Sequence, residues 1–257
     1  MKRREDNGEI ETVMSGKLPK LVELEDIKGD LHVHSKYSDG TATLEKIALK
    51  SKKLGYDYVA VCDHSACAKY DKDLGTRRLI KRNKEIDRLN SESEGITLLK
   101  GVEVNILPDG SLDYPDDLLE EFDFVVAGIH QNFRKNVTER VLAAMDNPNA
   151  DVIAHPTGRL LSGIVGHKID LDRIIERAKE TKTALEINAS PGRLDLNAIG
   201  CRKAKRVGVK LSIGSDAHAI WMMRFMKLGI AVARRGLLEK EDLLNTYPLG
   251  KLRKLRK

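Results

Sequence analysis

Short apolar segments alternate with amphipathic stretches along most of the chain. Segments of strand length, rich in β-branched residues, are each followed by a stretch in which apolar residues recur at helical spacing. Leu171, Ile174, Ile175 and Ala178, for example, stand at i, i+3, i+4 and i+7 and predict a helix with one apolar face. This alternation is typical of βα units, whose strands pair in parallel.

We predict seven strands separated by helices. The predicted strands are residues 29–34, 58–62, 97–104, 123–129, 150–154, 183–187 and 210–214. The predicted helices are residues 43–54, 76–90, 116–121, 138–145, 171–178 and 196–207. No Gly-rich dinucleotide-binding loop follows the first strand, which argues against an open dinucleotide-binding sheet. The fold class is therefore α/β, and we expect a distorted (β/α)7 TIM-like barrel.

The predicted barrel accounts for most of the chain. Residues 222–247 are expected to close it, so that the domain covers residues 27–247. Residues 1–26 are interpreted as an N-terminal arm, and residues 248–257 as a basic C-terminal tail. A solvated, frayed end is one interpretation of this tail, and a contact with a nucleic-acid backbone is the other.

Composition and charge narrow the class of protein. Of 257 residues, 41% are hydrophobic and 33% are charged, as in globular rather than disordered proteins. Neither a membrane-spanning run nor a signal peptide is present, so we expect a cytoplasmic protein with no membrane partner. Cys62, Cys67 and Cys201 form no Cys-x-x-Cys pair and are expected to be reduced. A net charge of +6 permits a polyanionic partner.

The segment DLHVHSKYSDG, residues 30–40, combines histidines and carboxylates at the end of the first strand. Side chains alternate along a strand, so Asp30, His32 and His34 are expected on one face. Asp30 could then accept the second ring N–H of a histidine, and Asp39, in a Ser-Asp-Gly turn, could reach the same point. Taken alone, a His-x-His pair is more often solvated or hydrogen-bonded than metal-binding.

The other predicted strands also end in residues that can bind a metal. In a barrel, the carboxyl ends of the strands meet at one rim. Six of the seven histidines fall there with three carboxylates, and only His167 lies elsewhere, in a Gly-rich loop. The candidate ligands are His32, His34, Asp39, His64, Glu103, His130, His155, Asp216 and His218, and Asp30 and Asp63 are candidate supporting residues. A single histidine at a strand end is more often structural, but six at one rim predict a metal centre.

The types of donor atom narrow the choice of metal ion. Imidazole and carboxylate donors suit divalent transition metals, and the lack of thiolates favours a catalytic over a structural site. Nine candidate ligands are too many for one ion and suit two or three. We expect Mn²⁺ or Zn²⁺, with Fe²⁺ as an alternative. Closely spaced cations would also attract a phosphate.

These motifs resemble those of the PHP (polymerase and histidinol phosphatase) domain family. The matching motifs are His32-x-His34, Asp39-Gly40, Asp63-His64, Glu103, His130, His155-Pro156 and Asp216-x-His218. The resemblance covers about residues 28–240 and implies a trinuclear centre in which Glu103 bridges two ions. It implies further ligands for these ions, His32, His34 and Asp216 for one and His130 and His155 for the other. A third ion would be bound by Asp39, His64 and His218.

A closer resemblance is to the C-terminal PHP domain of bacterial and archaeal family X DNA polymerases. It is carried by residues 18–40, 153–161 and 184–218. This resemblance implies a Mn²⁺-dependent 3′-5′ exonuclease and 3′-end phosphoesterase. The sequence begins where the polymerase domain of that family would end, so we expect no polymerase activity.

We hypothesise in-line hydrolysis of a phosphoester that depends on the metal-binding carboxylates of Glu103 and Asp216. Arg159, four residues after His155, and Arg193, after the sixth strand, are candidates to clamp a phosphate. A surface or loop-anchoring salt bridge is the alternative for each arginine.

The substrate remains open between three interpretations. The favoured one is a nucleic-acid 3′ end, because of the resemblance and the basic charge. A small phosphate monoester of the histidinol-phosphate or nucleoside-phosphate type is the alternative, and a non-catalytic accessory module is the third. No nucleotide cofactor is expected.

Overall fold

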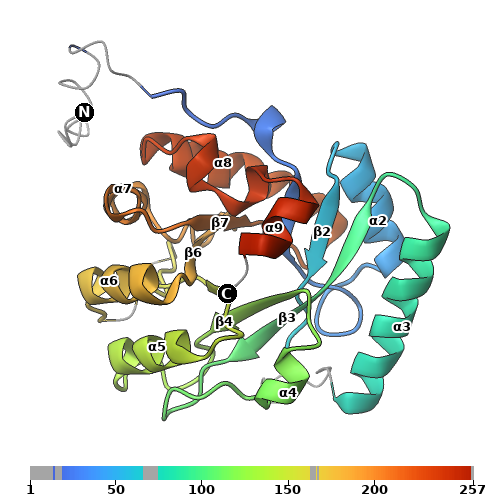
Figure 1. Cartoon of the computed structure of the whole chain (residues 1–257), viewed down its shortest axis with the longest axis horizontal. Helices are drawn as coiled ribbons and strands as arrows, with labels where there is room; N and C mark the ends of the chain where they lie inside the picture. Colours follow the sequence, from blue (N-terminus) through green and yellow to red (C-terminus); the bar gives the residue numbers. More distant parts are fainter. Residues whose placement is uncertain (1–13, 15–18, 66–74, 163–165, 167, 256–257) are drawn as a thin grey trace.

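Seven parallel strands form one sheet whose order follows the sequence, from β1 to β7 (Figure 1). The computed structural model describes residue 14 and residues 19–65, 75–162, 166 and 168–255. The strands are β1 (Gly29–Val33), β2 (Tyr58–Val61), β3 (Thr97–Asn105), β4 (Phe124–Gly128), β5 (Val152–Ile153), β6 (Ala184–Asn188) and β7 (Leu211–Gly214). All seven lie at the predicted positions, and the distorted (β/α)7 barrel is confirmed.

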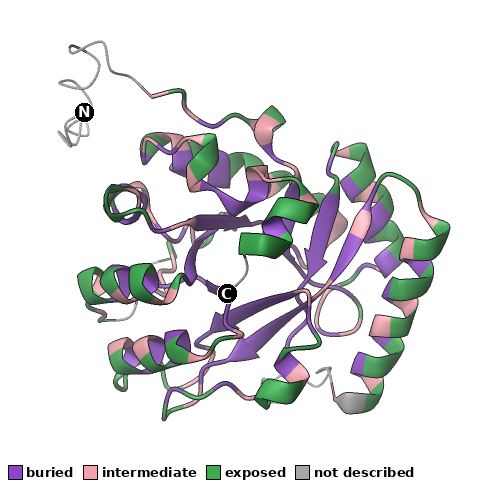
Figure 2. Cartoon of the chain, viewed as in Figure 1, coloured by how far each residue is buried: buried purple, intermediate pink, exposed green. Residues whose placement is uncertain are grey.

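Helices surround the strands, and each helix buries the side that faces the sheet (Figure 2). Six follow the predicted segments: α2 (Leu44–Lys53), α3 (Thr76–Glu92), α4 (Asp116–Leu119), α5 (Val137–Asp146), α6 (Leu171–Thr181) and α7 (Ala198–Val207). Two more follow β7: α8 (Met226–Arg235) and α9 (Leu249–Leu255). Short 3-10 turns complete the chain: η1 (Leu24–Asp26), η2 (Ile220–Phe225), η3 (Lys240–Asp242) and η4 (Leu244–Thr246).

Local signals in the sequence fix where these helices begin and end. The Asp170 side chain accepts a hydrogen bond from Arg173 N over 3.2 Å and starts α6. Asn197 accepts one from Gly200 N over 2.9 Å and starts α7, which ends at Gly208 with a φ of 84°. The two N-terminal caps therefore fix the ends of the loops that follow β5 and β6 at the rim.

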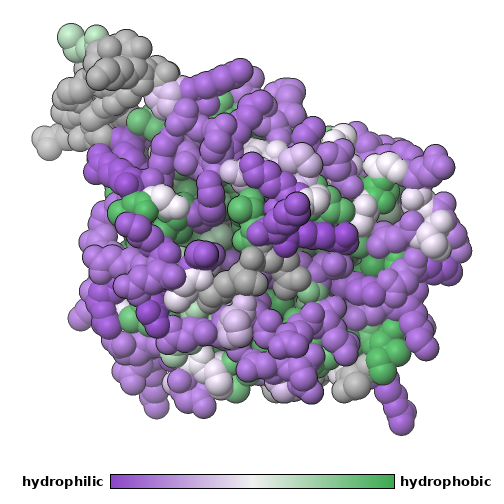
Figure 3. All heavy atoms as spheres, in the orientation of Figure 1, coloured by the Kyte–Doolittle hydropathy of each residue, from purple (hydrophilic) through white to green (hydrophobic). Residues whose placement is uncertain are grey.

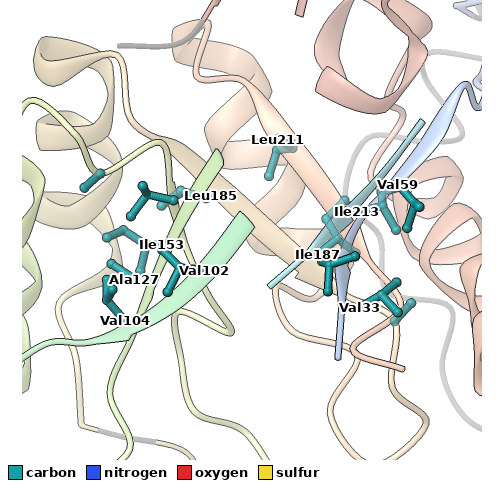
Figure 4. Close-up of a cluster of buried hydrophobic side chains, with 14 of the residues drawn as sticks. Val33, Val59, Val102, Val104, Ala127, Ile153, Leu185, Ile187, Leu211 and Ile213 are labelled. Carbon is teal, nitrogen blue, oxygen red and sulfur yellow. The ribbon is translucent and has the colours of Figure 1, made fainter. Parts of the chain in front are cut away.

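Buried apolar side chains form two layers. The outer layer packs between the strands and the helices and includes Val33, Val59, Val102, Val104, Ala127, Ile153, Leu185, Ile187, Leu211 and Ile213 (Figure 4). The inner layer fills the barrel and includes Leu31, Tyr58, Ala60, Leu99, Phe124, Val126 and Val152. Because these side chains fill the part of the interior near the amino ends of the strands, the polar side chains gather at the carboxyl ends.

β1 and β7 lie next to each other, which nearly closes the barrel. Asp216 N, just after β7, donates to His32 O over 2.9 Å. The buried Asn245 side chain donates to Gly29 O over 2.9 Å and to Ile213 O over 2.8 Å. Asn245, which belongs to the segment 222–247, thus joins the two strands.

Helix α9 contradicts one of the two interpretations of the basic tail, that of a frayed end. Leu252 is 2% exposed and packs with Leu244 against the inner apolar layer. Figure 1 shows α9 lying across the centre of the barrel. The prediction considered the lysines and arginines of this segment and overlooked the leucines between them, which cover the amino ends of the strands.

Residues 21–26 were predicted to belong to an N-terminal arm, but they pack against the domain. Val22 is fully buried, and its backbone N donates to Leu238 O over 3.0 Å. Leu21 forms an antiparallel bridge with Glu239. These residues therefore pack against the C-terminal segment, because Val22 supplies an apolar contact that the charge pattern concealed. Residues 1–13 and 15–18 of the predicted arm lie outside the described residues.

Hydrophilic side chains cover most of the face seen in Figure 3, with small apolar areas between them. Within the described ranges, the helices lack the length and apolar character needed to cross a membrane. Cys62 and Cys201 are buried free thiols, whereas Cys67 lies outside the described residues.

Candidate metal centre

All nine predicted ligands lie together at the carboxyl ends of the strands. His32 and Glu103 belong to β1 and β3, and the others lie on segments that follow strands. The side chains form three overlapping groups: His34, Asp39, His64 and His218; His32, His34 and Asp216; and His64, Glu103 and His130. His155 adjoins the third group through Glu103. His167, predicted to lie elsewhere, is outside the described residues.

Glu103 lies at the centre, and its two carboxylate oxygens face different histidines. Oε1 is 3.1 Å from Nε2 of His130 and 3.2 Å from Nε2 of His155. Oε2 is 3.3 Å from Nε2 of His32 and 3.2 Å from Nδ1 of His64. Because the two oxygens face different imidazoles, the carboxylate is arranged as a bridge between two cation positions would be.

Asp39 brings a second carboxylate to the centre from the turn after β1. Its Oδ2 is 3.2 Å from Nε2 of His218 and 3.7 Å from Nε2 of His64. Its Oδ1 is 3.5 Å from Nδ1 of His34. The turn passes so close to the strand that a Cβ on Gly40 would lie 2.5 Å from His34 O, so this turn needs glycine.

His32, His34 and Asp216 converge on a third position. The Nε2 atoms of His32 and His34 are 3.1 Å apart, and Nε2 of His34 is 3.3 Å from Oδ1 of Asp216. Nδ1 of His34 is buried and makes no hydrogen bond to a described residue. Imidazole nitrogens that face one another and a carboxylate in this way are suited to chelate a cation.

Two of the candidate ligands have left-handed backbone conformations, with φ values of 30° at His155 and 52° at Asp216. Such conformations cost about 1–3 kcal/mol and concentrate at functional sites. Specific contacts hold both residues, since His155 N donates to Glu186 Oε2 over 2.7 Å and Asp216 N donates to His32 O over 2.9 Å.

Two residues outside the predicted site orient the ligand rings. Glu186 Oε1 is 2.7 Å from Nδ1 of His32, and Asn105 Oδ1 is 2.7 Å from Nδ1 of His130. Such contacts fix the ring orientation and leave the other nitrogen facing the metal position. A sequence signal existed for Asn105, because it stands two residues after Glu103 and therefore on the same face of β3.

Asp30 corrects a prediction, because it does not accept the ring N–H expected of it. Its Oδ1 accepts from Ser215 N over 3.0 Å and from His32 N over 3.3 Å, while Glu186 contacts the His32 ring. The strict alternation on which the prediction depended is broken by a register shift between Asp30 and Val33 in the pairing of β1 with β2.

Asp63 supports the site by holding the loop that carries two ligands. Its Oδ1 accepts from Ser35 N and from Ser38 Oγ, each over 2.7 Å. The buried guanidinium of Arg82 lies 3.4 Å from Oδ2. The Asp63 side chain therefore fixes the path of residues 34–39.

The two predicted phosphate-clamping arginines have different surroundings. Arg159 Nε donates to Arg193 O over 3.0 Å, and Arg159 Nη2 donates to Leu194 O. Arg159 thus matches the loop-anchoring alternative, because backbone carbonyls occupy its guanidinium. The Arg193 side chain is 27% exposed, and its Nε lies 3.9 Å from Asp216 Oδ2, so it faces the centre.

Burial and neighbouring charges shift the pKa values in the centre. Burial alone would raise the pKa of Glu103, but the adjacent histidines, His32 first, hold it well below its usual range. Burial lowers the pKa of His64 to about 3, so this ring is neutral at pH 7. Burial alone would lower the pKa of His218, but its hydrogen bond with Asp39 raises it to about 9. The carboxylates are therefore ionised and attract cations.

The donor set fits divalent transition metals. Only imidazole nitrogens and carboxylate oxygens make up the three groups. The thiol of Cys62 instead donates to Leu31 O over 3.4 Å and lies in the inner apolar layer. The three overlapping groups suit two or three ions.

Several known proteins have sequences similar to that of this chain. The PHP domain family matches residues 30–190. The chain is 46% identical over 249 residues to the DNA polymerase/3′-5′ exonuclease PolX of Bacillus subtilis (strain 168), an alignment that covers 96% of this chain and 43% of that protein. The chain thus spans less than half the length of this relative. It is 30% identical over 240 residues to a probable phosphatase of Thermoanaerobacter sp. (strain X514), covering 87% of this chain and 92% of that protein.

A solved structure with a similar fold is the histidinol phosphate phosphatase of Lactococcus lactis subsp. lactis Il1403, in complex with zinc, L-histidinol and phosphate. Its TM-score is 0.58 at 20% identity, and the match covers 80% of this chain and 93% of that one. At this level of identity the likeness concerns the fold, which agrees with the barrel described above.

Proposed function

Because the chain belongs to the PHP domain family, we propose that it is a metal-dependent phosphoesterase that acts on the 3′ ends of DNA. The observation that carries this proposal is the cluster of nine imidazole and carboxylate side chains, with Glu103 at its centre. Two or three divalent ions, Mn²⁺ or Zn²⁺ with Fe²⁺ as an alternative, suit this cluster. When bound, they would lower the pKa of water and neutralise charge on a phosphoryl group.

The residues of the chain prepare the site for this reaction. Glu103 and Asp216 supply the negative charge that holds cations near a phosphate. Glu186 and Asn105 hold the rings of two ligands in one orientation, which reduces the reorganisation needed when substrate binds. Arg193, whose Nε lies 3.9 Å from Asp216 Oδ2, would contact a phosphate oxygen.

The DNA substrate is supported by the similarity to PolX. The alignment, at 46% identity, covers 96% of this chain, so it spans the loops around the metal centre as well as the barrel. The net charge of +6 agrees with a polyanionic substrate. We therefore favour removal of 3′-terminal nucleotides or of 3′-end phosphoester groups from DNA.

A small phosphate monoester is the second candidate. It is favoured by the probable phosphatase of Thermoanaerobacter, of which the alignment covers 92%. The same metal centre would serve either substrate, so the two functions differ only in what the protein binds beside the phosphate.

Hydrolysis assays with matched substrates test this proposal. Metal-stripped protein is reconstituted with Mn²⁺ or Zn²⁺ and offered a 5′-labelled single-stranded oligonucleotide, histidinol phosphate and an aryl phosphate. Stepwise shortening from the 3′ end is the expected result. Phosphate release from the small molecules with an intact oligonucleotide would support the second candidate. Hydrolysis of none of the three would contradict both.

A further inference from the structure

A cleft of about 910 Å³ continues outward from the metal centre. His130 and His155 line it where it meets the centre, and residues of the loops after β4 and β5 form its walls. This volume lies near the upper end of the range of about 300–1,000 Å³ that is typical of ligand pockets. The cleft is therefore larger than a phosphate group alone requires.

The walls of this cleft are basic. Arg134, Lys168, Arg173 and Arg193 line it, with Glu139 as an acidic neighbour. Arg173 is paired with Glu139 over 2.6 Å. Among the residues that the structure describes, Arg134 and Lys168 form no ion pair, and both are exposed. Two uncompensated cations beside a phosphate-binding centre favour a ligand with further phosphates.

An aromatic side chain stands beside these cations. Phe133 lines the cleft and is 50% exposed. Its loop is held from below by the buried Arg140, which donates from Nη1 to the carbonyls of Gln131 and Asn132 over 3.1 and 3.2 Å and from Nε to Leu107 O over 2.9 Å. The loop that carries Phe133 is thus fixed rather than free to fold over its aromatic ring.

Building on the proposed function, we propose that this cleft binds the nucleotides next to the scissile phosphate of a single DNA strand. Arg134 and Lys168 contact backbone phosphates, and Phe133 stacks on a base. Stacking on an aromatic ring tolerates any base, and cations that follow the backbone do not read sequence. The cleft therefore selects a polynucleotide over a small monoester without sequence preference.

Trp221 is a second exposed aromatic side chain that could stack on a base, and it therefore serves as a control for Phe133. It is 56% exposed on η2, with the Arg224 guanidinium 5.1 Å from its ring centroid. η2 follows β7, whereas Phe133 follows β4, and these strands lie across the barrel from each other in the strand order. A strand that left the centre over Trp221 would not contact Phe133.

Equilibrium binding tests the cleft independently of turnover. Anisotropy of a labelled, hydrolysis-resistant phosphorothioate oligonucleotide is measured with metal-loaded protein at several salt concentrations. Phe133→Ala should weaken binding roughly tenfold with an unchanged salt slope, because it removes a stacking contact. Arg134→Gln should lower the slope of log Kd against log salt by about 0.7, the value for one phosphate contact to a single strand. Lys254→Gln, on α9 at the other end of the barrel, should change neither quantity.

Turnover provides the second measurement. The ratio of kcat/KM for the oligonucleotide to kcat/KM for an aryl phosphate should fall about tenfold in Phe133→Ala. If wild-type protein shortens DNA but neither substitution changes Kd, slope or ratio, the cleft proposal is wrong while the proposed function stands. Weaker binding in Trp221→Ala but not in Phe133→Ala would also overturn it. If wild-type protein hydrolyses only small monoesters, the DNA function fails, and the cleft proposal fails with it.

Discussion

At the scale of single residues, Gly128 shows how closely the ligands pack around Glu103. A Cβ at this position would lie 2.8 Å from Cε1 of His130 and 3.2 Å from Oε1 of Glu103. Gly128→Ala should therefore displace the ring or the carboxylate and weaken metal binding by about tenfold or more, as changes beside metal ligands do. Metal titration of the stripped protein measures the affinity.

Gly250→Ala is the matched control for this prediction. It makes the same chemical change on α9, where a new Cβ would meet no atom within 4 Å beyond its chain neighbours and the backbone of its own helix. This variant should bind metal as the wild type does. Wild-type affinity in Gly128→Ala would mean that the candidate ligands around Glu103 can move aside at no cost, and it would contradict tight packing at this position.

Asp216 tests the centre through charge rather than volume. Asn has nearly the same shape but no negative charge, so Asp216→Asn should lower hydrolysis by at least about 100-fold while the circular dichroism spectrum stays unchanged. Asp172→Asn, which removes an exposed carboxylate 2.6 Å from Lys203, is the control and should keep full activity. Near-wild-type turnover in Asp216→Asn would remove Asp216 from the ligand set.

At the scale of elements, the loop between β4 and α5 depends on Arg140. This buried side chain donates hydrogen bonds to carbonyls of residues 106, 107, 131 and 132. Lys cannot reach all of these acceptors, so Arg140→Lys should lower the free energy of unfolding by about 2 kcal/mol and raise amide hydrogen exchange in residues 131–136. Arg177→Lys, which changes a surface ion pair, should cost less than about 0.5 kcal/mol. Unchanged exchange in Arg140→Lys would show that the loop is held by other contacts.

The elements and the grouping of the candidate ligands could be predicted from sequence patterns for the same reason. Because parallel strands end at one rim, a histidine or carboxylate at each predicted strand end was enough to place His130, His155 and Asp216 together. The partners of the rings could not be predicted in this way. Glu186 rather than Asp30 contacts His32, because that choice depends on the register between strands, which periodicity along one strand does not contain.

At the scale of the whole molecule, the barrel has a polar end and an apolar end that depend on each other. The inner apolar layer, which includes Tyr58 and Phe124, fills the interior below the metal centre. α9 covers this layer from the other side and places Leu252 against it. The charge pattern of residues 248–257 indicated a solvated segment. Its buried leucine instead covers the end of the barrel, because an uncovered end would expose apolar surface to water.

Leu252→Ala measures this closure. Removing a buried leucine side chain typically costs about 2–5 kcal/mol, and a site at the end of a barrel should fall near the lower limit, about 2 kcal/mol. Urea unfolding followed by circular dichroism gives the value, and Leu255→Ala, in which the side chain replaced is 37% exposed, should cost clearly less. The metal centre lies at the opposite end of the barrel. The metal affinity of the folded Leu252→Ala protein should therefore equal that of the wild type. A cost below about 0.5 kcal/mol, the range of surface substitutions, would mean that this segment is a solvated chain end, as its charge pattern indicated.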